Sequence, residues 1–446
     1  MLIAVPVPPG PITCHRDDHM NSAALIRRLL IDSFHAAVGA ADPLKLVARH
    51  LPAPPAGRTL VVGAGKAAAS MARAVELAWP AAAALSGLVV TRYGHGLPTA
   101  RISVSEAGHP LPDEAGHAAA GSILQLVSAL SPDDQLIALF SGGGSSLLAL
   151  PVAGVPMAEL TAVTQLLLHC GAPISEMNVV RKHLSQIQGG WLAAHCKAAL
   201  TALVISDVTG DDPSAVASGP TCPDASTFQD ALDVIARYSV AGPPRVMAHL
   251  QAGARGEIPE TPKPGSAGFA RTSMTVIARA RQSLQAAADF FQERGITPVV
   301  MGDTVTGEAS EVAKVYAALV REIRVHQQPF HAPVALISGG ECTVTVRGRG
   351  RGGRCTEFLA SLAIELGGMA EVHALAADTD GIDGTQDNAG ALLSPDTPRR
   401  AVQLGLNARK LLADNDSYSY FAALGDLLVT GPTRTNVNDY RVILIL

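Results

Sequence analysis

Two glycine-rich segments in the first half of the chain have the composition of phosphate-binding loops. Gly63 and Gly65 follow one run of apolar residues, and a second run is followed by Ser141, Gly142, Gly143, Gly144, Ser145 and Ser146. Glycine lets backbone N–H groups approach an anion closely, and the start of a following helix attracts negative charge. We therefore expect all eight residues to bind the phosphates of a nucleotide.

Lys66 completes the first of these segments as a candidate catalytic cation. A lysine in the first turn of a helix opposes the helix dipole, so its position favours an anion nearby. The segment lacks the P-loop pattern but matches Gly-x-Gly-x-x-Ala, a relaxed form of the dinucleotide-binding pattern. For both glycine-rich segments, a tight turn that binds no ligand is the alternative.

Asn178, Arg181 and Lys182 have the spacing of one face of a helix, which we predict over Glu176–Cys196. This face would present two cations and an amide to an anionic substrate, so we assign the three residues to substrate binding. A polar face in contact with solvent has the same spacing and is the alternative.

A group of acidic residues follows the predicted strand Leu200–Ser206. These carboxylates would repel one another unless a cation is bound, and Mg²⁺ binds one or two protein carboxylates together with phosphate oxygens and water. Asp207, next to the strand end, and Asp211 are the predicted Mg²⁺ ligands. Capping of the following turn is the alternative for Asp211 and Asp212.

The second half of the chain contributes one further cation and further acids. Arg354 follows the glycine-rich segment 347–353, and its planar guanidinium matches phosphate or carboxylate oxygens. RNA binding by this segment is disfavoured because it is short and lies within α/β-type sequence. Asp380 and Asp383 lie in a second acidic segment, and we expect them to bind substrate; metal binding or proton acceptance is the alternative.

Short apolar strands such as Gln135–Phe140 and Val334–Ser338 alternate with helices of ten to twenty residues. This alternation predicts an α/β protein with two doubly wound, Rossmann-like domains and an active site in the cleft between them. Glycine and proline are frequent between residues 251 and 272, which suggests a domain boundary. We expect an N-terminal extension over 1–19 and domains over 20–260 and 270–446.

Composition excludes several classes of protein. The 446 residues are 48% hydrophobic and 16% charged, which excludes a disordered chain, and a net charge of −5 without a basic stripe disfavours nucleic acid. No apolar run reaches the roughly 18 residues of a membrane span. Six cysteines without a C-x-x-C pair and the absence of a signal-peptide pattern favour the cytoplasm. A homodimer is among the assemblies that the sequence allows.

Nine segments together resemble the class II glycerate kinase family, whose C-terminal half is the MOFRL domain. They are VVGAGKAAASMA, TRYGHGLPT, GHPLPDEAG, SGGGSSLL, NVVRKHLSQIQGG, ISDVTGDDPSAVASGPT, GGECTVTV, DTDGIDGTQDNAGA and GPTRTNVND. The resemblance extends from about Met20 to Leu446. It implies two α/β domains with the active site between them, and ATP- and Mg²⁺-dependent phosphorylation of D-glycerate, usually at the 2-hydroxyl.

The resemblance also implies two key residues, because the family's lysine corresponds to Lys66 and its arginine to Arg354. The family pattern Gly-Gly-Arg-Asn-Gln-Glu here has Cys355 and Thr356 after the arginine, and Arg434 replaces a glycine. A Gly-Ser-Asn turn is replaced by 278–280, which reads Ala-Arg-Ala. These departures, all in the second half, leave open a paralogue with another hydroxy acid as its substrate.

Two other functions remain alternatives. Some members of the family carry the label hydroxypyruvate reductase, and the glycine pattern before Lys66 would suit NAD(P)H. The second predicted strand, Gly87–Thr91, is followed by Arg92 and not by the acid that binds the ribose of NAD; Arg92 would suit a 2′-phosphate, so NADPH stays an alternative. A sensor of sugar acids without catalytic activity is the other alternative.

Overall fold

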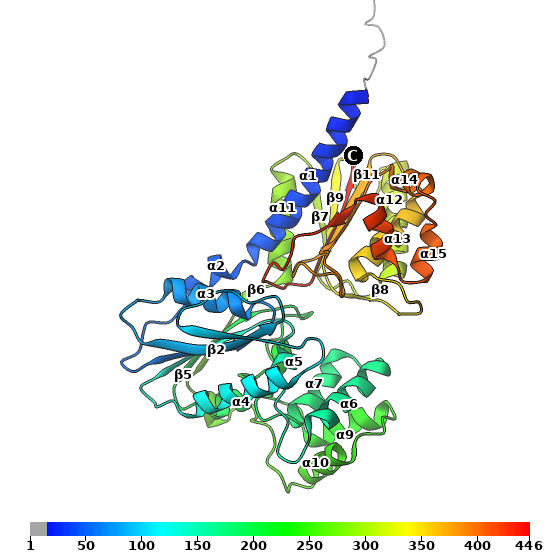
Figure 1. Cartoon of the computed structure of the whole chain (residues 1–446). Helices are drawn as coiled ribbons and strands as arrows, with labels where there is room; N and C mark the ends of the chain where they lie inside the picture. The colour runs from blue at the N-terminus through cyan, green and yellow to red at the C-terminus, as the bar shows by residue number, and fades with distance from the viewer. Residues whose placement is uncertain (1–15) are drawn as a thin grey trace, which may run out of the picture.

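The computed structural model describes residues 16–446, which form two lobes and a long first helix, α1 (Arg16–Ala40; Figure 1). Most of the predicted extension, residues 1–15, lies outside the described residues. Residues 16–19 are the beginning of α1. No helix in the described part of the chain has the length and apolar character needed to cross a membrane.

The first lobe contains a parallel sheet of six strands in the order β3-β2-β1-β4-β5-β6. This is the strand order of a doubly wound dinucleotide-binding sheet, with its switch point between β1 and β4. The doubly wound prediction is confirmed for this sheet. Its strands are β1 (Thr59–Ala64), β2 (Leu85–Arg92), β3 (Ile102–Ala107), β4 (Gln135–Phe140), β5 (Ala199–Ile205) and β6 (Thr272–Ala278).

Burial on both faces explains why the strands of this sheet are apolar throughout. Every residue of β1 and β4 is buried, and alternate side chains point to opposite faces. Leu136 and Ala138 belong to the core beneath α4 (Glu114–Ser128), whereas Ile137 belongs to the core beneath α3 (Ala68–Ala78).

The second lobe contains a mixed sheet of six strands, so the prediction of a second doubly wound domain is wrong. The order is β13-β12-β11-β14-β9-β7, and only β7 and β9 pair in parallel. No helix connects β11 to β12, and such direct returns produce antiparallel neighbours. The strands are β7 (Thr297–Gly302), β9 (Val334–Ser338), β11 (Val372–Asp378), β12 (Gly390–Leu393), β13 (Leu427–Leu428) and β14 (Asp439–Ile445), with β8 (Gly307–Glu308) and β10 (Cys342–Thr343) as a separate pair.

Helices cover both faces of the second sheet (Figure 1). Four helices, α6, α7, α9 and α10, form a helical group that extends the first lobe. α12 and α13 pack on one face, and α1 and α11 on the other. The bounds of these helices, of the other described helices and of the short 3₁₀ segments are α2 (Pro43–Leu46), η1 (Val47–His50), α5 (Gly144–Leu147), α6 (Met157–His169), α7 (Ile174–His183), α8 (Trp191–Ala194), η2 (Val216–Ser218), α9 (Phe228–Arg237), α10 (Pro244–Ala254), η3 (Ala267–Phe269), α11 (Ala280–Gln292), α12 (Ala309–His326), α13 (Arg354–Leu366), α14 (Thr397–Gln403), α15 (Ala408–Ala413) and α16 (Ser417–Leu424).

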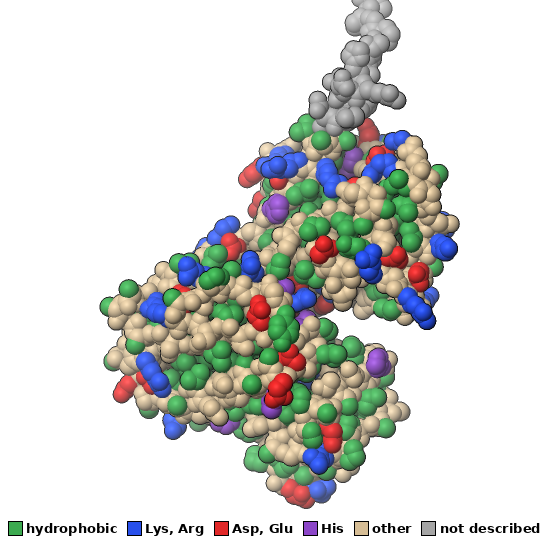
Figure 2. All heavy atoms as spheres, in the orientation of Figure 1, with side chains coloured by type: hydrophobic (Ala, Val, Ile, Leu, Met, Phe, Trp, Pro, Cys, Tyr) green, Lys and Arg blue, Asp and Glu red, His purple; other side chains and the backbone are tan. Residues whose placement is uncertain are grey.

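The chain crosses between the lobes twice. α1 packs on the second sheet, where the Tyr440 hydroxyl donates a hydrogen bond to Ser33 over 2.8 Å, so the chain enters the first lobe only after α1. β6 pairs with β5 and returns the chain to the second lobe through α11. The first sheet therefore extends past residue 270, where we expected the second domain to begin. Figure 2 shows an open recess between the second lobe and the helical group of the first.

Candidate active site

Lys66 connects the two lobes. It follows β1 at the switch point of the first sheet, and its Nζ lies 2.5 Å from Oδ2 of Asp380 in the second lobe. Burial works against the ammonium charge, but Asp380 and then Asp378 outweigh burial and raise the pKa of Lys66 above its ordinary value. Lys66 is therefore a permanently charged group at the junction of the lobes.

Arg354, the first residue of α13, is bound by three carboxylates of the second lobe. Its nitrogens lie 2.7 Å from Asp439, 2.7 Å from Glu341 and 2.9 Å from Asp378. Burial opposes the guanidinium charge, yet these acids raise its pKa well above the ordinary value. Asp378 and Asp439 meet because β14 begins beside the end of β11, where the two residues pair, and Glu341 follows Gly340, whose backbone oxygen accepts a hydrogen bond from Asp439 N–H.

The segment 378–380 brings the two predicted catalytic cations together. Arg354 contacts Asp378, and Lys66 contacts Asp380 two residues later. Burial raises the pKa of Asp378 well above its ordinary value, whereas the contact with Lys66 lowers that of Asp380 against the effect of burial. Two cations from opposite lobes therefore flank one pair of acids.

Asp207, after β5, lies at the same junction. Its Oδ2 accepts a hydrogen bond from Asn436 over 2.8 Å, and its backbone oxygen accepts one from Asn438 over 2.5 Å. Both asparagines belong to the loop before β14 in the second lobe. Burial, and then the charge of Glu341, raise the pKa of Asp207 to about 6.

The loop after β4 has backbone donors that face this junction. The N–H groups of Gly142 and Gly143 have no acceptor within the described residues. A Cβ at Gly142 would overlap the Asp207 carboxylate, and one at Gly143 would lie 2.9 Å from Nε2 of His109. Gly143 also has a φ of 81°, so this part of the predicted phosphate loop needs glycine for two physical reasons.

His109 and His95 were not predicted, although both lie in segments that resemble the family. Burial first, and then the neighbouring Lys66 and Arg92, lower the pKa of His109 to about 3. Burial and Arg92 lower that of His95 to about 4. The only signal in the sequence was the pair of His-containing turns, GHG and GHP. Both imidazoles are neutral at physiological pH and add hydrogen-bonding groups without charge.

The backbone N–H groups of Gly65, Lys66 and Ala67, in the first glycine-rich segment, are not free to bind phosphate. Gly65 N–H donates to Val90, Lys66 N–H donates to Gly142, and Ala67 N–H donates to the buried Oγ of Ser141. A Cβ at Gly63 would overlap the backbone of Leu139. Gly63, Gly65 and Ser141 therefore join β1 to β4, and their physical role is packing.

Asn178 is connected to the glycine-rich loop through Ser218, and Arg181 lies 3.5 Å from Asn178, but Lys182 points elsewhere. Asn178 Oδ1 accepts a hydrogen bond from Ser218 over 2.9 Å, and the Oγ atoms of Ser218 and Ser145 are 2.8 Å apart. Lys182 is buried on another side of α7, where its Nζ lies 3.4 Å from Asp224. The predicted helix over Glu176–Cys196 is divided into α7, which ends at His183, and the short α8; the left-handed Gly189 and Gly190 come directly before α8 and keep the two helices separate.

Asp383 and Asp211 have partners other than a ligand. The Asp383 carboxylate accepts hydrogen bonds from the N–H groups of Cys355 (3.0 Å) and Thr356 (2.9 Å), so it caps the start of α13. Asp211 lies 3.4 Å from Arg279, one of the residues that depart from the family pattern. Asp211 is thus paired with a cation.

Asp207 is the one predicted metal ligand whose surroundings fit Mg²⁺. No group of three or more histidines, cysteines or acids is placed to hold a metal ion within the described residues. Mg²⁺ does not need such a group, because it takes one or two carboxylates and completes its shell with phosphate and water. The Asp207 carboxylate accepts a single hydrogen bond from another side chain and feels the charge of Glu341.

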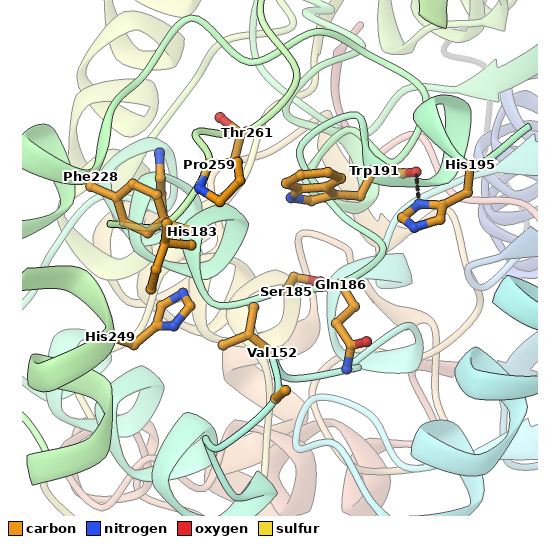
Figure 3. A pocket seen from close by; sticks show the side chains of 12 residues that line it. Val152, His183, Ser185, Gln186, Trp191, His195, Phe228, His249, Pro259 and Thr261 are labelled. Carbon is orange, nitrogen blue, oxygen red and sulfur yellow. Dashed lines mark hydrogen bonds between the residues drawn. The ribbon is translucent and has the colours of Figure 1, made fainter. Parts of the chain in front are cut away.

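A cavity lies away from this junction, within the helical group of the first lobe (Figure 3). It has a volume of about 370 Å³, and none of the predicted site residues lines it. Its wall includes Trp191, Phe228 and the imidazoles of His183, His195 and His249. The predicted site residues that come together therefore lie at the junction of the lobes and not in this cavity.

Two family models match the chain. One, described as "Domain of unknown function (DUF4147)", matches residues 29–251, and the model of the MOFRL family matches residues 334–439. The chain belongs to the DUF4147/MOFRL glycerate kinase family. The resemblance recognised in the sequence is confirmed.

Relatives within the glycerate kinase family carry two different names. A protein of Agrobacterium vitis named "Putative hydroxypyruvate reductase" is 50% identical, with 94% of each chain covered. The D-glycerate 2-kinase of Thermotoga maritima is 37% identical over 94% of this chain and 99% of its own. The crystal structure of glycerate kinase from the same organism superposes with a TM-score of 0.83 over 95% of this chain and 100% of its own. The two-domain glycerate kinase fold is therefore shared.

Proposed function

We propose that this protein is a kinase that transfers the γ-phosphoryl group of ATP to D-glycerate, at its 2-hydroxyl, with Mg²⁺ as cofactor. The observation that carries the proposal is the convergence of Lys66 and Arg354, from opposite lobes, on the acids 378–380 beside the glycine loop. Phosphoryl transfer depends mainly on alignment and on stabilising negative charge, which such an arrangement supplies. The relatives named glycerate 2-kinase support this assignment.

Each group at the junction has a distinct role in the proposed reaction. The free N–H groups of Gly142 and Gly143 would bind phosphate oxygens, as would the hydroxyl of Ser146. Lys66 would leave Asp380 for the transferring phosphoryl group, because a phosphate carries more charge than one carboxylate. Asp380, once released, is placed to accept a hydrogen bond from a hydroxyl of the substrate.

Mg²⁺ would be held by Asp207 and would neutralise charge on the phosphates when bound. Asn436 orients this carboxylate from the other lobe, so the arrangement of the ligand depends on how the lobes are placed. Movement of the lobes toward each other would exclude water from the recess and limit hydrolysis of ATP.

Hydroxypyruvate reduction with NADPH is the second candidate, and the name of the Agrobacterium relative favours it. The first glycine turn argues against a dinucleotide there, because Gly65, Lys66 and Ala67 already donate their N–H groups to protein oxygens. Absorbance at the nicotinamide band with hydroxypyruvate and NADPH, compared with ADP release with D-glycerate and ATP, separates the two activities.

Phosphorus NMR of the product formed from ATP and D-glycerate tests the reaction itself. We expect the resonance of 2-phosphoglycerate and ADP release that requires Mg²⁺. A 3-phosphoglycerate resonance would correct the position of transfer, and consumption of NADPH without ADP release would replace the proposal by the reductase.

Substitution of Lys66 and Arg354 tests their roles. Lys66→Met and Arg354→Met should each lower kcat by about 10²–10³, the usual effect of removing one group that stabilises transition-state charge. Lys182→Met is the matched control, since its ammonium pairs with Asp224 away from the junction. Near-normal kcat in both variants, with circular dichroism unchanged, would remove these residues from the mechanism.

A further inference from the structure

The segment 217–219, part of the Ser-Gly-Pro-Thr turn that no function above uses, has a strained backbone. Ala217, Ser218 and Gly219 have φ values of 52°, 58° and 60°, so three consecutive residues are left-handed. For Ala217 and Ser218 this conformation costs about 1–2 kcal/mol each, and it persists only where other contacts compensate. Ser218 is completely buried.

The strained turn places the Ser218 hydroxyl between two elements of the first lobe. Ser218 Oγ donates to Oδ1 of Asn178 on α7 over 2.9 Å, and it lies 2.8 Å from Oγ of Ser145 in the glycine loop. The amide of Asn178 donates in turn to the backbone of Ala215 over 3.3 Å. Because the single hydroxyl hydrogen of Ser218 goes to Asn178, Ser145 is the donor in its contact with Ser218, and binding of an anion would turn that hydrogen from Ser218 to the ligand.

Arg181 ends this network with a charge that has no counter-ion. Its Nη1 lies 3.5 Å from Oδ1 of Asn178, and no carboxylate lies within 4.0 Å among the described residues. Burial lowers the pKa of the guanidinium from its ordinary value. A desolvated cation without a partner is costly, so the site favours an anion.

We propose that the Arg181 guanidinium and the Ser145 hydroxyl bind the carboxylate of the acceptor acid, and that Ser218 is the residue that positions both. This rests on the proposed kinase function and specifies its acceptor as a small 2-hydroxy monocarboxylate. Arg181 and Ser145 are partly exposed, whereas Asn178 and Ser218 are buried behind them. One carboxylate matches the single uncompensated charge, and its two oxygens match the fork of the guanidinium.

Because Ser218 has a positive φ, its hydroxyl can be removed by a substitution that does not strain the turn. Glycine accepts a φ of 58° without strain, so Ser218→Gly removes the hydroxyl and leaves the turn intact. We expect KM for D-glycerate to rise about tenfold, since a hydrogen bond within a charged network is lost, with KM for ATP unchanged. Ala217→Gly is the control, because it relaxes the same turn and keeps the hydroxyl; its KM for D-glycerate should match wild type.

Arg181 supplies the second measurement. Arg181→Gln should raise KM for D-glycerate about 100-fold and abolish the preference for glycerate over its uncharged amide, with Arg181→Lys intermediate. An increase in KM for ATP in place of D-glycerate, or unchanged constants in both Ser218→Gly and Arg181→Gln, would overturn the inference alone. If the wild-type protein releases no ADP from ATP with D-glycerate, the proposed function itself fails.

Discussion

At the scale of single residues, charge and burial are balanced at the junction of the lobes. Lys66 and Arg354 are each satisfied by acids, although both are nearly removed from water. The ion pairs with these acids hold the two side chains in place, so a phosphate that binds Lys66 or Arg354 must compete with those carboxylates. His95 and His109 contribute polarity here without adding to the positive charge.

The neutral state of His109 makes stability depend on pH. Its pKa is about 3 in the folded protein, against an ordinary 6.5, so the unfolded chain binds more protons between these values. Protonation of this group does not lower the free energy of unfolding above pH 6.5, but it lowers that free energy progressively as pH falls from 6.5 toward 3. His109→Gln should reduce the slope of unfolding free energy against pH by up to about 1.4 kcal/mol per pH unit between pH 4.5 and 6.

Urea denaturation at several pH values measures this slope. His35→Gln is the control, because it changes a histidine at the protein surface. Equal slopes in wild type and His109→Gln would show that burial of this imidazole does not control its protonation.

At the scale of elements, α1 packs on the sheet of the second lobe, although the residues of the whole first lobe lie between α1 and that sheet in the sequence. Phe34 is fully buried among Leu284, Phe291 and Tyr440, with the rings of Phe34 and Tyr440 6.1 Å apart. The first helix of the chain thus completes the core of the second lobe.

Phe34→Ala should therefore destabilise the second lobe by about 3–5 kcal/mol, the usual cost of removing a buried phenyl ring. Both tryptophans, Trp79 and Trp191, belong to the first lobe and report on it separately. We expect the far-UV transition to shift to lower urea, with the fluorescence transition shifting less. An unchanged far-UV transition would mean that α1 does not stabilise the second lobe.

Elements were predicted correctly from the sequence where a short stretch of residues by itself favours the structure. The strands Gln135–Phe140 and Val334–Ser338 were predicted with the bounds that the structure has, because short apolar runs need only a covered sheet. The prediction of one helix over Glu176–Cys196 is confirmed only in part, because α7 ends at His183 and the left-handed Gly189 and Gly190 separate it from α8; periodicity does not reveal backbone φ. β12 was missed because four residues carry too little pattern.

At the scale of the whole molecule, a few polar contacts hold the lobes in register. Besides the pair Lys66–Asp380, the loop before β14 donates three hydrogen bonds to the first lobe or its connection. Two go to Asp207, and Thr435 donates the third to the backbone of Ala41 over 2.7 Å. These contacts join the loops that carry the proposed chemistry.

Removing two of these hydrogen bonds should loosen the junction without unfolding either lobe. In the double variant Asn436→Ala/Asn438→Ala, amide exchange of 206–209 and 378–380 should accelerate roughly 30-fold, because two hydrogen bonds are lost and each is worth about 1 kcal/mol. Asn415→Ala, whose bonds lie within the second lobe, is the control. Unchanged exchange in the double variant would show that other contacts hold the lobes.

The sequence by itself determined the α/β class and the family, and it supplied candidate residues for the proposed site. Short apolar strands, glycine turns and polar side chains after strand ends are local properties, so Lys66, Arg354, Asp207 and the Ser141–Ser146 loop were found without the fold. Tertiary structure alone decided which of these groups meet. It placed Asp383 at the start of α13, gave Lys182 and Asp211 partners elsewhere, and revealed the neutral histidines and the left-handed turn at Ser218. Such partnerships depend on contacts between distant segments, and the residue types along the chain do not specify them.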